Sequence, residues 1–286
     1  MKKINTLADL KNSDYLTVDF YLSKSCNKSC HYCTAWTLEM RYLTVDMDFL
    51  RRTCQYLSPY KTRICLLGGE PGLIKNLDEV IAEIKKASPS AGIIIKDYDP
   101  VKIANMYKSN KATCLSVLTE EDFFLGDLTH ISQIKQKVNL PILCKDFFID
   151  KFQIPLAKSY GADAILIILA GVSDKLADEL YEEALKLNMS VIVEVHTVNE
   201  AKQALRFKDA LLGINNRNLK TLKTDINTTY DIHDILVNHP GPLISESGIK
   251  SKEELLELSN KTSIKTFLIG ESLLKNLDDN SIFSVL

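Results

Sequence analysis

The sequence lacks long apolar segments. None of its apolar runs approaches the roughly 20 residues that a membrane-spanning helix needs. The basic start, within residues 1–20, is followed by no apolar stretch of the kind found in a secretory signal. These absences predict a cytoplasmic protein with no membrane partner.

Neither sign of charge is in excess. The chain has 35 Lys and Arg against 37 Asp and Glu, a formal net charge of −2. Proteins that bind nucleic acid or anionic membranes usually carry a clear basic surplus, so we expect neither partner. With 45% hydrophobic and 25% charged residues, the composition is that of a globular protein and excludes a disordered or fibrous one.

The seven cysteines do not suggest disulfides. Their number is odd and no export signal accompanies them. Three lie within eight positions, as Cys26-x3-Cys30-x2-Cys33, whereas Cys114 and Cys144 lie in apolar runs and are expected to be buried. The amino-terminal cluster is therefore the group that could have a function.

Residues 77–276 alternate short apolar runs with amphipathic segments. The runs are rich in β-branched residues and apolar on both faces, as parallel strands covered by helices are. We expect strands at residues 80–85, 112–118, 141–146, 162–170, 190–196, 210–215, 242–247 and 265–270. Eight such units predict an α/β fold, a (β/α)8 TIM barrel over residues 77–286, with a partial βα extension over residues 1–76. A doubly wound sheet is the second choice, because no G-x-G-x-x-G follows the first strand.

Charged residues end several of these strands. In a TIM barrel the carboxyl ends of the strands meet at one mouth, so lysines and glutamates from separate strands should converge there. Opposite charges at close range shift one another's pKa, which suits acid–base chemistry. The turns Ser247-Gly248 and Gly270-Glu271-Ser272 follow the last two strands, where this fold usually binds phosphate through backbone N–H groups.

Residues 80–275 closely resemble the indole-3-glycerol-phosphate synthase family. The matching segments are IAEIKKASPS (81–90), SVLTEEDFF (116–124), PILCKDFFID (141–150), GADAILII (161–168), VEVH (193–196), GINNRNLKT (213–221), ISESGI (244–249) and FLIGESLL (267–274). The resemblance implies a carboxy-lyase of tryptophan biosynthesis. Its substrate would be 1-(2-carboxyphenylamino)-1-deoxyribulose 5-phosphate, which loses carbon dioxide and water as the indole ring closes, with no cofactor required.

The resemblance also implies roles for individual residues. Lys145 matches the general acid, Glu194 and Lys85 match groups that transfer protons, and Glu83 matches the carboxylate that positions Lys85. Asn215, Glu246 and Ser247 match groups that orient intermediates, and Arg217 is a candidate partner of the substrate carboxylate. The phosphate cradle would be Lys85, Ser88, Gly248, Gly270 and Ser272, and the wall against the aromatic ring Phe124 and Phe147. Glu271, where the family often has Ser, should point away from the phosphate.

Residues 1–76 do not show the helical segment with which this family normally begins. Cys26, Cys30 and Cys33 resemble the cluster loop of radical S-adenosylmethionine enzymes, and Gly68-Gly69-Glu70-Pro71 resembles their motif for that cofactor. Three thiolates leave one iron of a [4Fe–4S] cluster open to such a ligand. A closed zinc site would need a fourth ligand, for which the spacing of His31 is poor.

Only two βα units, LTVDFYL and TRICLLGG, precede the barrel, far fewer than a radical enzyme's own domain contains. Three interpretations stay open: a truncated remnant fused to a synthase, a cluster with a regulatory or electron-transfer role, and a radical enzyme completed by another chain. The barrel itself could also be a non-catalytic phosphate-binding remnant. Apart from the phosphosugar–anthranilate substrate, other enzymes of the tryptophan pathway are candidate partners.

Overall fold

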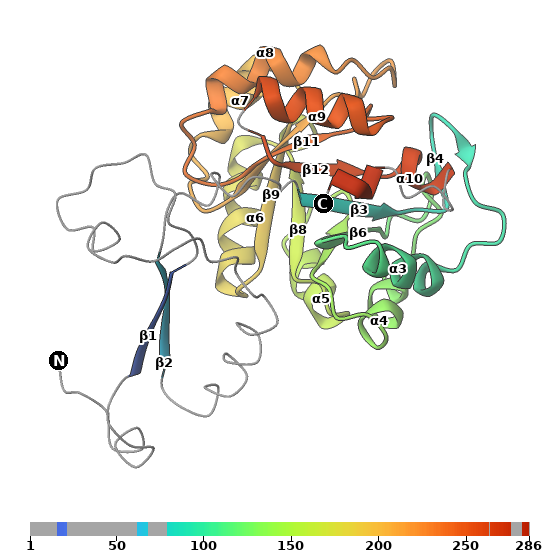
Figure 1. Ribbon diagram of the computed structural model, residues 1–286, viewed down its shortest axis with the longest axis horizontal. Coiled ribbons are helices and arrows are strands. Elements are labelled where there is room, and N and C mark those ends of the chain that lie inside the picture. Colours follow the sequence, from blue (N-terminus) through green and yellow to red (C-terminus); the bar gives the residue numbers. More distant parts are fainter. Residues whose placement is uncertain (1–15, 22–61, 68–78, 263, 276–281, 286) are drawn as a thin grey trace. The chain divides into compact units, whose positions relative to one another are not determined.

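The computed structural model describes residues 16–21, 62–67, 79–262, 264–275 and 282–285 (Figure 1). The chain divides into two compact units, residues 1–77 and residues 78–286. In the first unit, β1 (Leu16–Tyr21) and β2 (Thr62–Leu67) pair in parallel, with Leu16 opposite Thr62. These are the two strands expected ahead of the barrel.

The second unit is a closed barrel of eight parallel strands, which confirms the predicted TIM barrel. The order around the barrel follows the sequence, from β3 through β6 to β12 and back to β3. The strands are β3 (Glu79–Ile84), β6 (Cys114–Leu118), β7 (Ile142–Lys145), β8 (Ala164–Ile168), β9 (Ser190–Val195), β10 (Leu211–Asn215), β11 (Leu243–Glu246) and β12 (Thr266–Ile269). All eight predicted strands are therefore present.

Helices cover the outside of the barrel (Figure 1). They are α3 (Pro100–Ser109), α4 (Thr129–Lys135), α5 (Gln153–Ser159), α6 (Asp174–Lys186), α7 (Val198–Ala204), α8 (Asn227–Leu236), α9 (Lys252–Lys261) and α10 (Glu271–Lys275), with short 3-10 helices at Leu169–Gly171 and Ile282–Val285. A small hairpin, β4 (Ala87–Ser88) and β5 (Gly92–Ile93), follows β3. None of the helices in the described part of the chain has the length and apolar character that crossing a bilayer requires.

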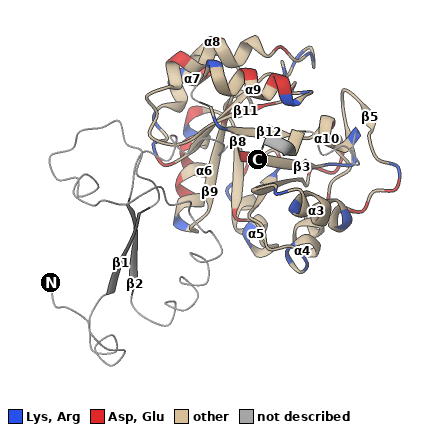
Figure 2. Ribbon diagram, in the orientation of Figure 1, with Lys and Arg blue, Asp and Glu red and all other residues tan. Residues whose placement is uncertain are grey.

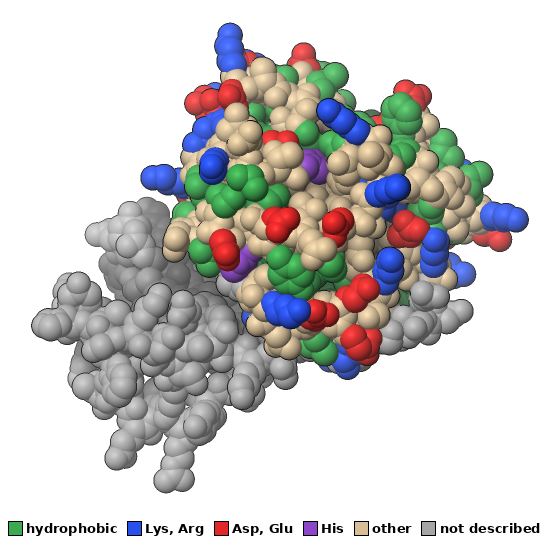
Figure 3. All heavy atoms as spheres, turned by 90° about the horizontal axis from the view of Figure 1, so that it is seen from above, with side chains coloured by type: hydrophobic (Ala, Val, Ile, Leu, Met, Phe, Trp, Pro, Cys, Tyr) green, Lys and Arg blue, Asp and Glu red, His purple; other side chains and the backbone are tan. Residues whose placement is uncertain are grey.

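Side-chain caps set the starts of α3, α6, α7 and α9. Asp99 accepts hydrogen bonds from the backbone N–H groups of Val101 and Lys102, and Pro100 stands at the first helical position of α3. Ser173 caps α6 in the same way, as its position before an amphipathic segment suggests. On their exposed faces the helices carry acidic and basic side chains side by side (Figures 2 and 3).

The core has an outer and an inner part. The outer part lies between the strands and the helices and contains, for example, Val80, Ala82 and Ile84 of β3. The inner part is a cluster inside the barrel, made by Ile81, Leu143, Leu166, Ile192, Ile244 and Leu268. Because side chains alternate along a strand, the residue two positions after each of these also faces the interior. These residues, two positions further along each strand, form the floor of the barrel's mouth at the carboxyl ends of the strands.

Candidate active site

Four of the residues that follow the inner apolar cluster are charged. Glu83, Lys145, Glu194 and Glu246 stand two positions after Ile81, Leu143, Ile192 and Ile244, at the carboxyl ends of β3, β7, β9 and β11. The side chains of Glu83, Glu194 and Glu246 are at most 6% exposed, and that of Lys145 is 14% exposed. The expected convergence of lysines and glutamates is therefore present.

Lys145 lies between two of these carboxylates. Its Nζ is 2.9 Å from Glu246 Oε2 and 3.2 Å from Glu83 Oε2. Burial alone would lower the pKa of Lys145, but Glu246, Glu83 and Glu194 outweigh burial and raise it above the ordinary value. The Lys145 ammonium is therefore charged in the resting site.

The carboxylates respond differently to this shared cation. Burial would raise the pKa of Glu83, but Lys85, 2.5 Å away, and Lys145 lower it to about 2. At Glu246, burial and repulsion by Glu194 and Glu83 outweigh the attraction of Lys145, and the pKa rises to about 7. Glu83 is thus ionised, whereas Glu246 can exchange a proton near neutral pH.

Glu194 has a cationic neighbour of its own. Nε2 of His196 lies 3.1 Å from Glu194 Oε1, and Nδ1 of His196 lies 3.4 Å from Glu200 Oε2. Burial opposes the charge on His196, but these two carboxylates raise its pKa to about 9. Despite burial, His196 and Lys145 lower the pKa of Glu194. Oε2 of Glu194 is buried and has no hydrogen-bond partner among the described residues.

Two glycines leave room for these carboxylates. A Cβ at Gly213 would collide with the carboxylate of Glu246, and a Cβ at Gly270 would collide with that of Glu83. Gly213 occupies an inward position of β10, and Gly270 directly follows β12. A side chain there would displace the acidic groups, so the glycines are part of the site's geometry.

Two cavities adjoin the charged cluster. The larger, of about 430 Å³, is lined by the turns after β11 and β12 and by the cations Lys85, Arg217, Lys250 and Lys275. The smaller, of about 110 Å³, is lined mainly by apolar and aromatic groups, including Phe124, Phe147, Leu118, Leu166 and Ile168, and also contains Lys145, Glu194 and Asn215. Glu83, Lys85, Arg217 and Ser247 line both cavities, which therefore adjoin one another.

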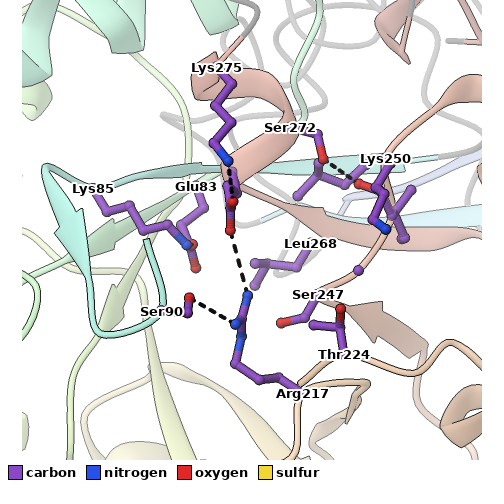
Figure 4. A pocket seen from close by; sticks show the side chains of 15 residues that line it. Glu83, Lys85, Ser90, Arg217, Thr224, Ser247, Lys250, Leu268, Ser272 and Lys275 are labelled. Atoms are coloured by element: carbon purple, nitrogen blue, oxygen red, sulfur yellow. Dashed lines mark hydrogen bonds and ion pairs between the residues drawn. The ribbon is translucent and has the colours of Figure 1, made fainter. Parts of the chain in front are cut away.

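Most of the predicted substrate-binding residues line these cavities. Gly248, Gly270 and Ser272 line the larger one, and Phe124 and Phe147 the smaller. Ser88 differs: it is buried in β4, where its hydroxyl accepts a hydrogen bond from the N–H of Ala91. Its neighbour Ser90, rather than Ser88, lines the larger cavity and accepts a hydrogen bond from Nη1 of Arg217 (Figure 4).

Contrary to the expectation, Glu271 does not turn away from the larger cavity. Glu271 lines the larger cavity, where its carboxylate lies 2.6 Å from Nζ of Lys275 and 3.7 Å from Nη2 of Arg217. Contact with Lys275 lowers the pKa of Glu271. The surrounding cations neutralise this carboxylate, so its presence does not make the cavity acidic.

Sequence reasoning missed several residues of the larger cavity. Ser90, Thr224, Lys250 and Lys275 line it but lie outside the strand ends. Lys275 could have been found from its spacing, since it follows Glu271 by four residues on a helix and pairs with it. The predicted ligands Cys26, Cys30 and Cys33, and the motif Gly68-Gly69-Glu70, lie outside the described residues and stay predictions.

The model of the family "Indole-3-glycerol phosphate synthase" matches residues 73–285. The chain belongs to the indole-3-glycerol-phosphate synthase family. Among the synthases it is similar to, that of Burkholderia multivorans is 44% identical over 68% of this chain and 74% of its own length. That of Azospirillum brasilense is 44% identical over 74% of this chain and 77% of its own length.

A longer relative and two solved structures complete the comparison. "Tryptophan biosynthesis protein TrpCF" of Buchnera aphidicola is 45% identical over 70% of this chain, and the match covers 44% of the Buchnera protein. Phosphoribosyl anthranilate isomerase from Thermotoga maritima aligns with a TM-score of 0.55 at 10% identity, over 72% of this chain and 97% of that one. A mutant tryptophan synthase α-subunit from Pyrococcus furiosus aligns with 0.53 at 11% identity, over 72% and 94%. These two likenesses show the barrel fold alone.

Proposed function

We propose that the chain is an indole-3-glycerol-phosphate synthase, which closes the indole ring of 1-(2-carboxyphenylamino)-1-deoxyribulose 5-phosphate. The products are indole-3-glycerol phosphate, carbon dioxide and water. The observation that carries the proposal is the largely buried Lys145 ammonium between Glu246 and Glu83. Lys145 lines the aromatic cavity, and Glu83 lines both the aromatic and the cationic cavity.

The two cavities match the two ends of this substrate. A phosphate fits the larger cavity, where lysines, Arg217 and the glycine turns supply positive charge and backbone N–H groups. The smaller cavity, whose lining includes Phe124 and Phe147, suits an aromatic ring. Arg217 lines both, and its guanidinium suits the carboxylate that the ring carries until decarboxylation.

Proton transfers then follow from the charged cluster. As the ring carbon attacks the ketone carbon, Lys145 donates a proton to the developing oxyanion, and carbon dioxide leaves with its bond electrons returned to the ring. The hydroxyl formed in this way must next leave as water. That step needs an acid at the oxygen and a base at the neighbouring carbon, for which Lys85 and Glu194 are the candidates.

The remaining groups hold the reacting atoms in place. Glu83 contacts both lysines and so fixes their positions, while the side chain of Asn215 accepts a hydrogen bond from the N–H of Arg217. Glu246 and Ser247 are candidates for orienting the intermediates. The groups that transfer protons in this scheme are side chains of the barrel, held in fixed positions.

The test measures how fast Lys145→Met converts the carboxyphenylamino-deoxyribulose phosphate. The fluorescence of the indole product reports the rate, and the assay is run in air with a chelator present. Loss of the general acid should reduce kcat by about 10²–10⁴-fold. Lys135→Met is the matched control, because Lys135 pairs with Asp163 at 2.5 Å, away from the lining of either cavity. Its kcat should stay within about threefold of wild type.

Two outcomes would contradict the proposal. If Lys145→Met kept nearly full activity, the proton-transfer assignment would be wrong. If the wild-type chain bound the substrate without turnover, the barrel would be a non-catalytic phosphate-binding remnant. The small-molecule substrate is the partner that this function requires. Contacts with other tryptophan-pathway enzymes and a cytoplasmic location stay predictions.

A further inference from the structure

A closed network of buried polar side chains lies under the Ser247-Gly248 turn. Asn216, which follows β10 and is 2% exposed, donates from Nδ2 to Ser245 Oγ and to the carbonyl of Ser247, both at 3.1 Å. Its Oδ1 accepts from the N–H of Thr229 at 3.1 Å and from Thr229 Oγ1 at 2.8 Å. Both donors and both acceptor positions of the amide are thus used.

The orientation of the amide is fixed by its partners. The backbone N–H of Thr229 can only donate and the carbonyl of Ser247 can only accept, so Oδ1 must face the first and Nδ2 the second. The hydroxyls of Thr229 and Ser245, both fully buried, lie 2.8 Å apart and close the ring. The network therefore joins the end of β10, strand β11 and the first turn of α8.

Asn216 holds two successive carbonyls of one strained segment. Its backbone N–H donates to the carbonyl of Glu246 at 2.9 Å, and its side chain donates to that of Ser247. Ser247 and Gly248 both have positive φ, +66° and +80°. The left-handed conformation is costly for a residue with a Cβ, so Ser247 needs outside contacts to keep it.

This turn forms one wall of the cationic cavity. Ser247 and Gly248 line it, followed by Ile249 and Lys250, whereas Asn216 is not among the lining residues. Figure 4 shows Ser247 and Lys250 on the same side of the cavity, across from Lys85. The position of this wall decides where its backbone N–H groups and the Lys250 ammonium can meet an anion.

We propose that Asn216 is a positioning residue for the anion-binding end of the site. It keeps the Ser247-Gly248 turn in its left-handed conformation, and so sets phosphate affinity without touching the substrate. The inference rests on the proposed function, since it assigns the larger cavity to the substrate phosphate. The alternative is that Asn216 contributes only to the stability of the buried core.

Thr229→Val separates the two roles. Like Asn216→Ala, it removes hydrogen bonds from the buried network, so both variants should be less stable. Only Asn216→Ala also loses the contact with the carbonyl of Ser247. A purely stabilising network would make the two variants alike at the site, whereas a positioning role makes them differ.

The experiment measures the Kd of inorganic phosphate by titration calorimetry, with KM and kcat from product fluorescence, on the full chain. Asn216→Ala should raise Kd and KM by at least about tenfold, a larger factor than the fall in kcat that follows from moving Ser247. Thr229→Val should leave Kd and KM within about twofold of wild type. Equal effects of the two variants, or an unchanged Kd in Asn216→Ala, would overturn the proposal.

A second variant covers the case in which Asn216→Ala does not fold. Asn216→Asp keeps the shape of the side chain and the oxygen that accepts from Thr229, but places a second acceptor against the carbonyl of Ser247. The variant should bind phosphate with a higher Kd than wild type. The ratio of the two Kd values should be the same in 1 M salt, which screens the repulsion between the new carboxylate and phosphate. Loss of that ratio in salt, or no change in Kd, would overturn the proposal. If wild type itself neither bound phosphate nor turned over, the proposed function would fail instead.

Discussion

Two layers of inward-facing side chains lie two residues apart along the strands: the inner apolar cluster, or lower layer, and the charged groups at the mouth, or upper layer. One layer is apolar and the other is charged. The lower layer holds leucine and isoleucine, as at Leu143 and Ile244, and the upper layer holds Lys145 and Glu246 on the same strands. Burying apolar side chains stabilises the barrel, whereas burying charges costs free energy unless they are paired. Stability and chemistry should therefore be separable by substitutions two residues apart.

The largest effect on stability is expected for Leu143→Ala in the lower layer. Leu143 is fully buried, so removing its side chain should lower the free energy of unfolding by about 2–5 kcal/mol. Leu143 lines neither cavity, so kcat should stay within about threefold of wild type. Urea unfolding and product fluorescence give the two numbers.

Leu256→Ala is the control for that substitution. Leu256 lies on α9 with 36% of its surface exposed, so the same change should cost less than about 1 kcal/mol. The comparison between the layers would break if Leu143→Ala lost activity as severely as Lys145→Met. That result would mean that the lower layer also sets the geometry of the catalytic groups.

In the upper layer, the expected effect is a pH-dependent gain in stability on replacing Glu246 by Gln. The pKa of Glu246 is raised from 4.5 to about 7, so the folded chain holds a proton that the unfolded chain has released between these values. The wild type therefore loses stability as pH rises through this range. Relative to wild type, Glu246→Gln should gain about 2 kcal/mol between pH 5 and pH 8.

Urea unfolding of both proteins at pH 5, 6, 7 and 8 measures this difference. The gain should appear mostly below pH 7, where the folded-state proton is still bound, and level off above it. A difference that stayed constant across the series would show that Glu246 ionises normally in the folded chain. Product fluorescence should at the same time report reduced turnover, since Glu246 contacts the ammonium of Lys145.

The sequence was sufficient to predict the barrel and most of its mouth, for a physical reason. Parallel strands buried on both faces give continuous apolar runs, and their carboxyl ends must meet, so Lys145 and Glu194 could be brought together from the printed order alone. Ser88 was predicted where Ser90 lines the cavity, because the conformation of the β4–β5 hairpin decides which serine faces it. The direction of Glu271 was misjudged because its ion pairs with Lys275 and Arg217 hold it at the cavity. Nothing in the sequence pointed to Asn216. Its proposed role depends on a hydrogen bond to Ser247, thirty-one residues further along the chain, and on the positive φ of Ser247.

The smallest predicted effect concerns the rim around the mouth, where the helices begin. Ser173 caps α6 by accepting a hydrogen bond from the N–H of Leu176 at 3.3 Å, so Ser173→Ala should lower the free energy of unfolding by about 1 kcal/mol. Ser173 lines neither cavity, and kcat should not change. The helix starts at the rim and the charged upper layer lie at the same end of the barrel. A loss of stability without a loss of activity would therefore show that the chemistry depends on the upper layer and not on the rim. A matching fall in kcat would show instead that the rim helices help to shape the site.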